Sequence, residues 1–543
     1  MSDDEPSAVL DTGHSDFAAR PELRGHVAAR AVRGLARRGG KTFVVDRTLD
    51  RRELSGAMLL AVARVMAERW RPRLGSENRV GVVFPAGIGT LVANLALAML
   101  GKVPVNLNFT IGRAAAEKCI AKAGLRTILT AGAVKEKVPD FPWTEACIDL
   151  AEERKGVRKM DIILNLLAIR LLPASWLIRK WGVPTDGGDR EAGLLFSSGS
   201  TGDPKGVALT HANIIGNCLQ IESCGLLDAR ETMMACLPTF HSFGFTVTVW
   251  YPFFTGMRIV TLPSPLETRR VADAVEAEKV TVMMGTPTFL RPYFKRVEPS
   301  KLKSLRFVVG GAEKTPRGFH RMWEDTFGGN YLEGYGLTET SPVVSCNLPA
   351  RGGNAAEIRE GSVGRLFPGM EARVVDPSTG EVKRRGELGI LELKGVNVFG
   401  GYLDDPVATR QCFRNGWFVS GDLARIDDGG FLYIEGRLSR FSKLGGEMVP
   451  HGTVEQVIIE AFGLQDSESP LVAVTGVYDN RKGEALVVLA AVEIKPDALR
   501  ARLTKRGLPN LWIPRTIKRV DAIPCLASGK LDLRALNELA ELA

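Results

Sequence analysis

The clearest chemical potential lies in residues 196–206, whose sequence is FSSGSTGDPKG. Its glycines permit a tight backbone path, and its hydroxyls and backbone N–H groups can surround phosphate oxygens. Lys205 adds a point charge, but Gly206 follows it where a Walker A loop has Ser or Thr. A flexible polar loop is the alternative, which the apolar runs on both sides disfavour. The residues expected to hold nucleotide phosphates are Ser197, Ser198, Gly199, Ser200, Thr201, Gly202 and Lys205.

Two further segments carry residues suited to nucleotide and acid chemistry. In residues 333–340 (EGYGLTET), Tyr335 offers a ring that can stack on a purine, and Thr338 a hydroxyl for an α-phosphate. Glu339 offers a hard oxygen ligand for Mg²⁺. Near the C-terminus, Lys530 lies within the sequence SGKLD, where a mobile point charge can neutralise charge on a reacting centre. An exposed tail lysine is the ordinary alternative for Lys530.

The sequence SSGSTGDPKGV resembles the phosphate loop of the adenylate-forming superfamily, which includes acyl-CoA synthetases, amino-acid adenylation domains and beetle luciferases. Residues 333–340 resemble the second signature of that family. The segment GWFVSGD at 416–422 resembles the element whose aspartate binds the ribose hydroxyls. These motifs follow one another in the family's order, and the match covers nearly the whole chain. The resemblance therefore implies a ligase that uses ATP and Mg²⁺.

The resemblance also assigns individual residues to the nucleotide site. It implies that Asp422 and Arg437 contact the ribose and that Glu339 binds Mg²⁺. Lys530 would reach the carboxylate and the α-phosphate while the acyl-adenylate forms. The residues implied around the adenine and in the second signature are Gly311, Ala312, Glu313, Glu333, Gly334, Tyr335 and Gly336.

The implied reaction has two steps. A carboxylate attacks the α-phosphorus of ATP to give acyl-AMP and pyrophosphate, and a thiol then attacks the acyl carbonyl and expels AMP. Related enzymes rotate a small C-terminal domain between the steps. The hinge would lie at Arg440, where many relatives carry Asp or Lys, and Lys443 would face the site during thiol transfer.

The acid-binding element of the family corresponds to PTFHSFG at residues 238–244. Relatives that activate amino acids usually carry an aspartate here, and this chain has none. A neutral wall of aromatic residues and glycine suits the alkyl chain of a medium- to long-chain fatty acid. Trp250 and the pair Met283 and Met284 can extend this wall. We place His241 of this element among the catalytic residues, with Thr338, Glu339 and Lys530.

Residues 238–244 and 440–449 look most like one subgroup, the acyl-acyl-carrier-protein synthetases, which includes the synthetase half of a bifunctional acylglycerophosphoethanolamine acyltransferase. That likeness favours the phosphopantetheine thiol of acyl-carrier protein as acceptor, and a basic surface suits an acidic carrier. A fatty acyl-CoA ligase, with CoA as acceptor, would use the same nucleotide motifs. A non-catalytic AMP-binding protein is a different class of alternative, and intact Lys205, Glu339 and Lys530 argue against it.

The elements that must position these residues alternate between strand-like and helix-like runs over residues 56–107, 194–218 and 257–309. Such alternation is typical of an α/β protein with parallel sheet layers. After residue 361, short strand-like runs between Gly, Asp and Pro turns predict a β-rich subdomain. We expect an N-terminal adenylation domain over 1–439, β-rich over about 361–439, and a small mobile α+β C-terminal domain over 440–543.

The bulk properties agree with an enzyme of more than one domain, because 543 residues exceed one ordinary core. The net charge of +9 is modest and scattered, and no nucleic-acid-binding motif accompanies it. The eight cysteines show no CxxC spacing, so we expect reduced, buried thiols in a cytoplasmic protein. Residues 1–15 lack the basic and apolar regions of a secretory signal.

One apolar segment, IILNLLAIRLLPASWLI at residues 162–178, is flanked by Arg and Lys on both sides. It is short for a transmembrane span and contains Asn165, Arg170 and Pro173. A basic, apolar and helical stretch is typical of a segment that lies on a bilayer surface. The alternative is a helix or loop that packs against the protein, so the sequence leaves peripheral membrane contact open.

Overall fold

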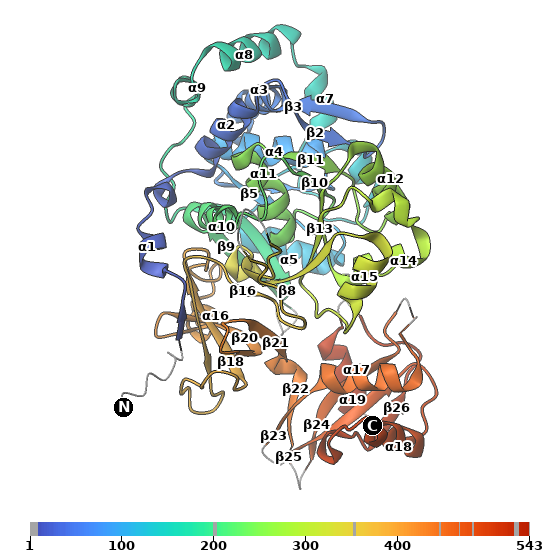
Figure 1. Cartoon of the computed structure of the whole chain (residues 1–543). Coiled ribbons are helices and arrows are strands. Elements are labelled where there is room, and N and C mark those ends of the chain that lie inside the picture. The colour runs from blue at the N-terminus through green and yellow to red at the C-terminus, as the bar shows by residue number, and fades with distance from the viewer. Residues whose placement is uncertain are drawn as a thin grey trace.

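The computed structural model describes residues 9–198, 203–350, 355–444, 447–465, 467, 469–479, 483–525 and 531–541 (Figure 1). Within these ranges, helices flank two sheets built largely from parallel strands, an antiparallel sheet follows, and a small α+β unit ends the chain. The predicted α/β class, with a β-rich part and a small α+β C-terminal part, is therefore confirmed. The domain boundary at residue 440 stays a proposal.

The first sheet has the strand order β7-β6-β4-β5-β8-β9. Its neighbours pair in parallel except β8 and β9, which form an antiparallel hairpin. Helix α4 (Ile88–Met99) lies between β4 and β5 in the chain and is buried on nearly every side, as its apolar sequence requires. The strands are β4 (Arg79–Val82), β5 (Val103–Asn106), β6 (Thr127–Thr130), β7 (Ala146–Asp149), β8 (Glu191–Ser198) and β9 (Pro204–Thr210).

The second sheet has the order β16-β15-β14-β13-β12-β10-β11-β2-β3. Its central strands are parallel, and antiparallel pairs close both edges. Short, wholly buried strands such as β12 and β13 match this arrangement, because parallel sheets are covered on both faces. The strands are β2 (Thr42–Asp46), β3 (Arg52–Ser55), β10 (Thr232–Ala235), β11 (Arg258–Thr261), β12 (Val282–Gly285), β13 (Phe307–Gly310), β14 (Asn330–Gly336), β15 (Val343–Cys346) and β16 (Arg365–Leu366).

The third sheet is antiparallel and corresponds to the predicted β-rich region. β1, from the N-terminal end of the described chain, pairs with β17, so the start of the chain adds an edge strand to this sheet. Residues alternate between buried and half-buried along β17, as expected for a sheet with one covered face. The strands are β1 (Val9–Asp11), β17 (Met370–Val375), β18 (Gly389–Gly395), β19 (Phe413–Arg414), β20 (Trp417–Ile426) and β21 (Leu432–Arg437).

Residues after the short helix η5 (Leu438–Arg440) build apolar clusters of their own, in which all members lie beyond residue 440. Figure 1 shows this unit below the large part of the molecule, joined to it after β21. Its elements are β22 (Phe441–Leu444), β23 (Glu447–Pro450), α17 (His451–Phe462), β24 (Val472–Asp479), β25 (Gly483–Ala490), α18 (Pro496–Lys505), β26 (Thr516–Arg519) and α19 (Leu533–Glu541).

Side-chain caps fix where the main helices begin. Ser55 accepts a hydrogen bond from the backbone N–H of Met58 at the start of α3, and Thr210 and Asn213 form a reciprocal capping box at the start of α10. The longer helices of the large part are α2 (Val27–Arg38), α3 (Gly56–Leu74), α5 (Arg113–Ala123), α8 (Lys159–Leu171), α9 (Ala174–Trp181), α10 (His211–Ser223), α12 (Thr268–Glu278) and α15 (Phe319–Phe327). The shorter ones are α1 (His14–Ala18), α6 (Gly132–Lys137), α7 (Leu150–Lys155), α11 (Tyr251–Thr255), α13 (Pro287–Leu290), α14 (Tyr293–Arg296) and α16 (Pro406–Gln411).

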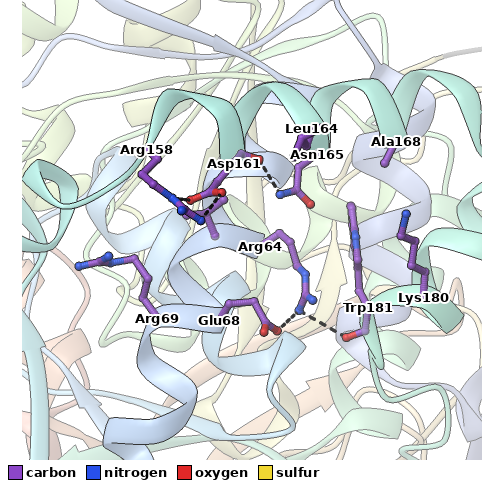
Figure 2. Close-up of a pocket in the computed structure, with 11 residues that line it drawn as sticks. Arg64, Glu68, Arg69, Arg158, Asp161, Leu164, Asn165, Ala168, Lys180 and Trp181 are labelled. Carbon is purple, nitrogen blue, oxygen red and sulfur yellow. Dashed lines mark hydrogen bonds and ion pairs between the residues drawn. The ribbon is translucent and has the colours of Figure 1, made fainter.

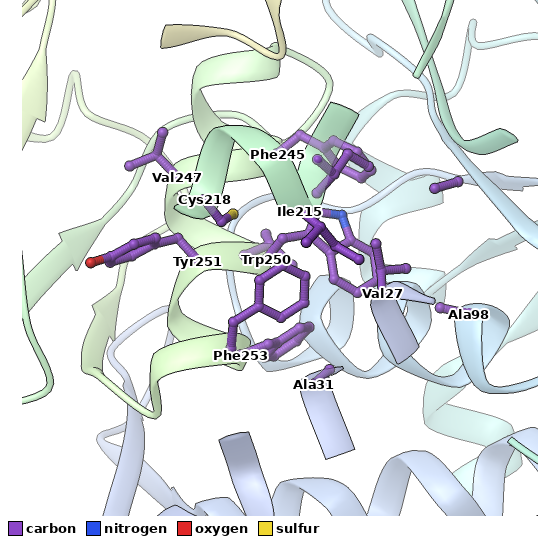
Figure 3. Close-up of a cluster of buried hydrophobic side chains, with 14 of the residues drawn as sticks. Val27, Ala31, Ala98, Ile215, Cys218, Phe245, Val247, Trp250, Tyr251 and Phe253 are labelled. Atoms are coloured by element: carbon purple, nitrogen blue, oxygen red, sulfur yellow. The ribbon is translucent and has the colours of Figure 1, made fainter. Parts of the chain in front are cut away.

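Trp250 lies in the core of the large part and does not line an acyl pocket as the sequence suggested. It ends the irregular helix η2 (Phe243–Trp250) and is fully buried. Its ring packs edge-on against Phe245 and Phe253, and Figure 3 shows these side chains gathered with residues of α2. Burial of this ring in the core is favourable because a tryptophan buries more apolar surface than most side chains.

Two further expectations from the sequence concern the cysteines and residues 162–178. All eight cysteines are free thiols, but Cys525 is exposed, because it lies after β26 outside the apolar clusters. The prediction of buried thiols is therefore wrong at Cys525, and Cys147, Cys224 and Cys412 are only half-buried. Residues 162–178 form two helices, α8 and α9, that separate at Leu172 and Pro173. Among the described residues, no helix is both long and apolar enough to cross a membrane.

Candidate active site

The glycine- and hydroxyl-rich loop connects the two strands of the β8–β9 hairpin. Ser197 pairs with Lys205 in the register of this hairpin, so both predicted phosphate ligands lie at its end. Ser198 is the last residue of β8. Gly199, Ser200, Thr201 and Gly202 lie outside the described residues. On the far side of β9, the backbone N–H of Leu403 donates to the carbonyl of Gly206 at 2.8 Å, which brings the 402–403 segment beside the loop.

The second motif runs along β14 and into the short helix η4 (Thr338–Thr340). β14 pairs in parallel with β13 and antiparallel with β15, so Glu333, Gly334, Tyr335 and Gly336 occupy an interior strand. A side chain at Gly336 would place its Cβ 1.9 Å from the carbonyl oxygen of Pro342. Glycine is therefore required here by close backbone approach. Thr338 and Glu339 follow at the end of the strand.

A buried carboxylate joins the second motif to the β-rich sheet. The hydroxyl of Tyr335 donates to Oδ2 of Asp422, and Nε of Arg437 lies 2.8 Å from Oδ1 of the same carboxylate. Asp422 is 2% exposed. Burial and this carboxylate raise the pKa of Tyr335 well above its usual range, so the phenol stays protonated and fixed as a donor.

A second contact chain links the phosphate loop to the proposed magnesium ligand. Nζ of Lys205 lies 4.9 Å from the centroid of the Tyr402 ring, and the Tyr402 hydroxyl donates to Oε1 of Glu339 at 2.9 Å. The carboxylate of Asp422 raises the pKa of Arg437, with a smaller contribution from Glu339. Charges from three sequence-distant motifs therefore act on one another at this point.

The predicted acid-binding element meets the same site. The hydroxyl of the buried Ser242 lies 3.5 Å from the hydroxyl of Thr338. His241 is exposed, and its ring meets that of Phe240 with 4.8 Å between centroids. A Cβ added at Gly311 would lie 3.9 Å from Phe243 and 3.3 Å from the carbonyl oxygen of Gly334. A side chain at position 311 would therefore crowd the backbone of the second motif beside the acid element.

Comparisons with known proteins identify the family of this chain. The AMP-binding enzyme family matches residues 31–403. The chain belongs to this family. This AMP-binding enzyme is 31% identical over 465 residues to a feruloyl-CoA synthase of Amycolatopsis sp, covering 84% of this chain and 87% of that protein. It is also 31% identical over 358 residues to a long-chain-fatty-acid–CoA ligase of Bacillus subtilis, covering 64% of this chain and 61% of that protein.

Solved structures agree with this assignment. MatB from Rhodopseudomonas palustris with bound ATP has a TM-score of 0.76 and 25% identity, over 94% of this chain and 98% of that one. The O-succinylbenzoate coenzyme A synthetase MenE of Bacillus subtilis, in complex with ATP and magnesium ion, shares the fold with a TM-score of 0.76 and 22% identity, over 93% of this chain and 99% of that one. The predicted adenylate-forming superfamily is therefore confirmed, and the AMP-binding enzyme has the fold of acid–thiol ligases.

The residues present fit a nucleotide with Mg²⁺. Among the described residues, no group of three or more His, Cys, Asp or Glu side chains could hold a metal by itself. Mg²⁺ in nucleotide enzymes commonly takes one or two carboxylates and completes its shell with phosphate oxygens and water. Glu339, which uses Oε1 toward Tyr402, can supply one such carboxylate oxygen. When bound, Mg²⁺ would neutralise phosphate charge beside Lys205.

The other predicted residues of the AMP-binding enzyme make contacts of their own or lie outside the described residues. Ala312 adopts a left-handed backbone with φ of 65°, and the carboxylate of Glu313 accepts a hydrogen bond from the hydroxyl of Thr288 at 2.6 Å. Glu313 is therefore tied to α13. Burial raises the pKa of Glu333. Lys530 lies outside the described residues, and for Lys443 only the backbone in β22 is described.

The proposed hinge residue binds the C-terminal unit. Arg440 donates to the carbonyl oxygen of Val474 at 2.9 Å and to Oε1 of Glu455 at 2.6 Å. These bonds fix the end of η5 on α17 and β24, so a rotation about this point would carry Arg440 with the smaller unit.

Tyr402 is the site residue that the sequence did not reveal. It follows two glycines in a segment without strand or helix periodicity, and it lies far along the chain from both Lys205 and Glu339. An isolated bridge between Val207 and Tyr402 places it. Because this is a contact between distant segments, only a structure or coupled variation among relatives could have signalled it.

Proposed function

We propose that this AMP-binding enzyme uses ATP and Mg²⁺ to convert a medium- to long-chain fatty acid into acyl-AMP, and then transfers the acyl group to a phosphopantetheine thiol. The observation that carries the proposal is the meeting of three motifs. The acid element reaches the second motif at Ser242 and Thr338, and Tyr402 joins that motif to Lys205. A carboxylate in the acid element would thus lie beside the phosphates of a nucleotide held by the other two.

The nucleotide roles follow from the chemistry of each group. Asp422, held by Arg437 and Tyr335, keeps lone pairs that can accept hydrogen bonds from the ribose hydroxyls. Lys205 and Glu339 with its Mg²⁺ would balance the β- and γ-phosphates. The residues proposed to surround the adenine and the phosphate loop are Gly311, Ala312, Glu313, Glu333, Gly334, Gly336, Ser197, Ser198, Gly199, Ser200, Thr201 and Gly202.

In the first step, a carboxylate oxygen of the fatty acid forms a bond to the α-phosphorus, and the bond to the bridging oxygen breaks. Pyrophosphate leaves with the electron pair. We assign Thr338 as donor to the α-phosphate oxygen and Lys530 as the charge that offsets the developing negative charge. His241, at the exposed mouth of the acid element, would orient the carboxylate.

In the second step, a thiolate sulfur attacks the acyl carbonyl, and AMP leaves as the phosphate oxygen takes the electron pair of the acyl bond. Arg440 is the proposed hinge between the steps, and Lys443 would replace Lys530 near the site. In this mechanism, residues 1–439 form the adenylation domain and residues 440–543 form the part that moves.

A fatty acid is the proposed substrate because the described acid element carries no carboxylate that could pair with an amino group. Phe240 packs edge-on against Phe109 with 5.4 Å between centroids, which gives this element an aromatic wall. Met283 and Met284 are buried. Their flexible side chains can repack around an alkyl chain.

The favoured acceptor is acyl-carrier protein, because residues 238–244 and 440–449 resemble the synthetases that use it. CoA is the second candidate, and it is favoured by the similar proteins, which include a feruloyl-CoA synthase and a long-chain-fatty-acid–CoA ligase. Both acceptors present the same phosphopantetheine thiol, so the chemistry of the second step is common to them.

Product identification tests the proposal. The full-length enzyme is incubated with palmitate, ATP and Mg²⁺, with CoA and holo-acyl-carrier protein in separate samples, and the products are weighed by mass spectrometry. We expect palmitoyl-carrier protein in excess over palmitoyl-CoA. Palmitoyl-CoA as the better product would overturn the favoured acceptor and leave the ligase assignment, whereas no acyl-AMP and no thioester would overturn both.

Substitution of Lys530 separates catalysis from binding. Lys530→Ala should abolish acyl-AMP formation while ATP binding and the fold persist, because this lysine is proposed to act on the reacting centre. Lys495→Ala, at an exposed position of the C-terminal unit, is the control. Equal activity of both variants would remove Lys530 from the proposed mechanism.

A further inference from the structure

Helix α8 is apolar on two opposite faces. Ile162, Leu166 and Ile169 pack against the large core, and α8 contacts α3. The remaining apolar residues point away from the protein at helical spacings of three and four, so they form a stripe along the outside of the helix. Figure 1 shows α8 at the outer edge of the molecule, beyond α3. Packing against the protein accounts for the inward apolar residues of α8, but it does not account for the outward ones.

This stripe concentrates the exposed apolar surface of the molecule. Among the described residues, fourteen large apolar side chains are exposed, and six of them lie within residues 160–176. The exposed side chains are Met160 (59%), Ile163 (47%), Leu164 (56%), Leu167 (48%), Leu171 (74%) and Trp176 (67%). A contiguous exposed apolar patch marks an interaction surface, whereas isolated exposed residues need no explanation.

Basic residues border the stripe. Lys159, Arg170, Arg179 and Lys180 are exposed, and none of them forms an ion pair with a described residue. Trp176 lies in the first turn of the neighbouring helix α9, whose inner face packs on α2. Tryptophan is favoured at the boundary between apolar and polar regions of a bilayer, and lysine and arginine are attracted to anionic headgroups.

A cavity of about 420 Å³ lies along the inner edge of α8, between α3 and the end of α9 (Figure 2). Its acidic residues are already engaged, because Glu68 pairs with Arg64, and Asp161 pairs with Arg158 at 3.1 Å. Lys180 lines the same cavity, and so does Leu164 of the outer stripe. The cavity thus offers positive charge next to the apolar stripe.

We propose that α8 and α9 dock this protein on an anionic lipid bilayer, with the apolar stripe inserted among the acyl chains and the basic border against the headgroup phosphates. Helix α8 has 13 residues and would be about 20 Å long, so it would lie along the surface and not span the bilayer. A protein partner would need acidic residues around an apolar groove. The basic residues that border the stripe, together with Trp176, suit an anionic bilayer better than such a protein partner.

Vesicle binding tests the proposal with the full-length protein, without ATP or fatty acid, so the result is independent of acyl activation. Vesicles of phosphatidylcholine alone are compared with vesicles that also contain phosphatidylglycerol, and bound protein is measured by flotation. The double substitution Leu167→Gln and Leu171→Gln should weaken binding at least about tenfold. The matched control, Leu49→Gln with Leu266→Gln, removes two exposed leucines elsewhere and should bind as the original protein does.

A second pair of variants tests the basic border. Lys159→Gln with Lys180→Gln should lose about tenfold in binding to phosphatidylglycerol vesicles, whereas Lys295→Gln with Lys303→Gln should not. Failure of the original protein to bind either vesicle would overturn the proposal, as would equal binding by the leucine variant and its control. A dimer in light scattering that the leucine variant converts to a monomer would also overturn it, in favour of a second copy on this face.

Discussion

Arg437 and Asp422 face each other across the antiparallel strands β20 and β21, with Nε of Arg437 2.8 Å from Oδ1 of Asp422. The two residues differ in exposure, because the side chain of Arg437 is 55% exposed and that of Asp422 is 3% exposed. Tyr335 holds the other carboxylate oxygen from β14. The carboxylate is therefore oriented before any ligand arrives, which lowers the entropy cost of binding.

Removal of the charge at Asp422 should weaken nucleotide binding. Asp422→Asn keeps the size of the side chain but loses the ion pair with Arg437 and a charged acceptor for the ribose. Hydrogen bonds to charged groups contribute about 1.5–3 kcal/mol, so we expect ATP affinity to fall about ten- to a hundredfold. Isothermal titration calorimetry measures it. Asp427→Asn, which removes a carboxylate paired with Arg359, is the control, and equal affinities would contradict the ribose assignment.

Tyr402 should act as a positioning residue for Glu339. Tyr402→Phe keeps the ring against Lys205 and removes the hydroxyl that donates to Glu339. We expect the Mg²⁺ concentration for half-maximal adenylation to rise about five- to tenfold, with a smaller change in the rate at saturating Mg²⁺. Tyr433→Phe, which removes a hydroxyl from Asp427, is the matched control. An unchanged Mg²⁺ dependence would show that Tyr402 has no part in holding the ion.

Acid should destabilise the fold through a buried histidine pair. The rings of His26 and His211 lie 3.8 Å apart, and Nδ1 of each accepts a backbone N–H at the start of α2. Burial lowers the pKa of His26 to about 4 and that of His211 to about 3. Below pH 6.5 the unfolded chain therefore binds more protons than the folded one, and stability falls as the pH drops toward 4.

The expected loss from His26 alone is about 3 kcal/mol between those two pH values. Urea unfolding across this range measures it. His26→Asn keeps an acceptor that can cap α2 and removes the titration, so its stability should depend less on pH. His320→Asn lies outside the pair and serves as control. A slope that His26→Asn leaves unchanged would assign the acid sensitivity to other groups.

Trp250 should contribute to stability and not to acyl selectivity. Trp250→Ala would leave a cavity among Phe245, Phe253 and Phe254 and should lower the free energy of unfolding by about 3–5 kcal/mol. The milder Trp250→Phe should keep the preference for acyl chain length, as measured with acids of increasing length. A changed chain-length preference in that variant would show that Trp250 lines the acyl pocket.

Sequence patterns predicted the elements that carry local signals. Alternation of apolar strands with helices such as α3 and α4 gave the α/β class, and the strand runs after residue 361 gave the β-rich sheet. The phosphate loop was correctly placed between two apolar strands, which form the β8–β9 hairpin. These features depend on residues near one another in the chain, and periodicity reports them directly.

Contacts between distant segments could not be predicted from the sequence. Tyr402 meets Lys205 and Glu339 only because the chain after β18 returns to β9. Trp250 was misassigned, because an aromatic residue near an acid element looks the same whether it lines a pocket or fills the core. The sequence also left two interpretations of residues 162–178 open, packing on the protein and contact with a bilayer. When a helix has two apolar faces, its hydrophobic periodicity does not distinguish the face that packs from a face that docks.

The most direct test of the central claim is fatty acid-dependent exchange between ATP and labelled pyrophosphate, because it measures formation of acyl-AMP without any acceptor thiol. We predict exchange with palmitate and Mg²⁺ that disappears in Lys530→Ala and persists in Lys495→Ala. Exchange supported by amino acids but not by palmitate, or no exchange with any carboxylic acid, would contradict the proposal that this enzyme activates fatty acids as adenylates.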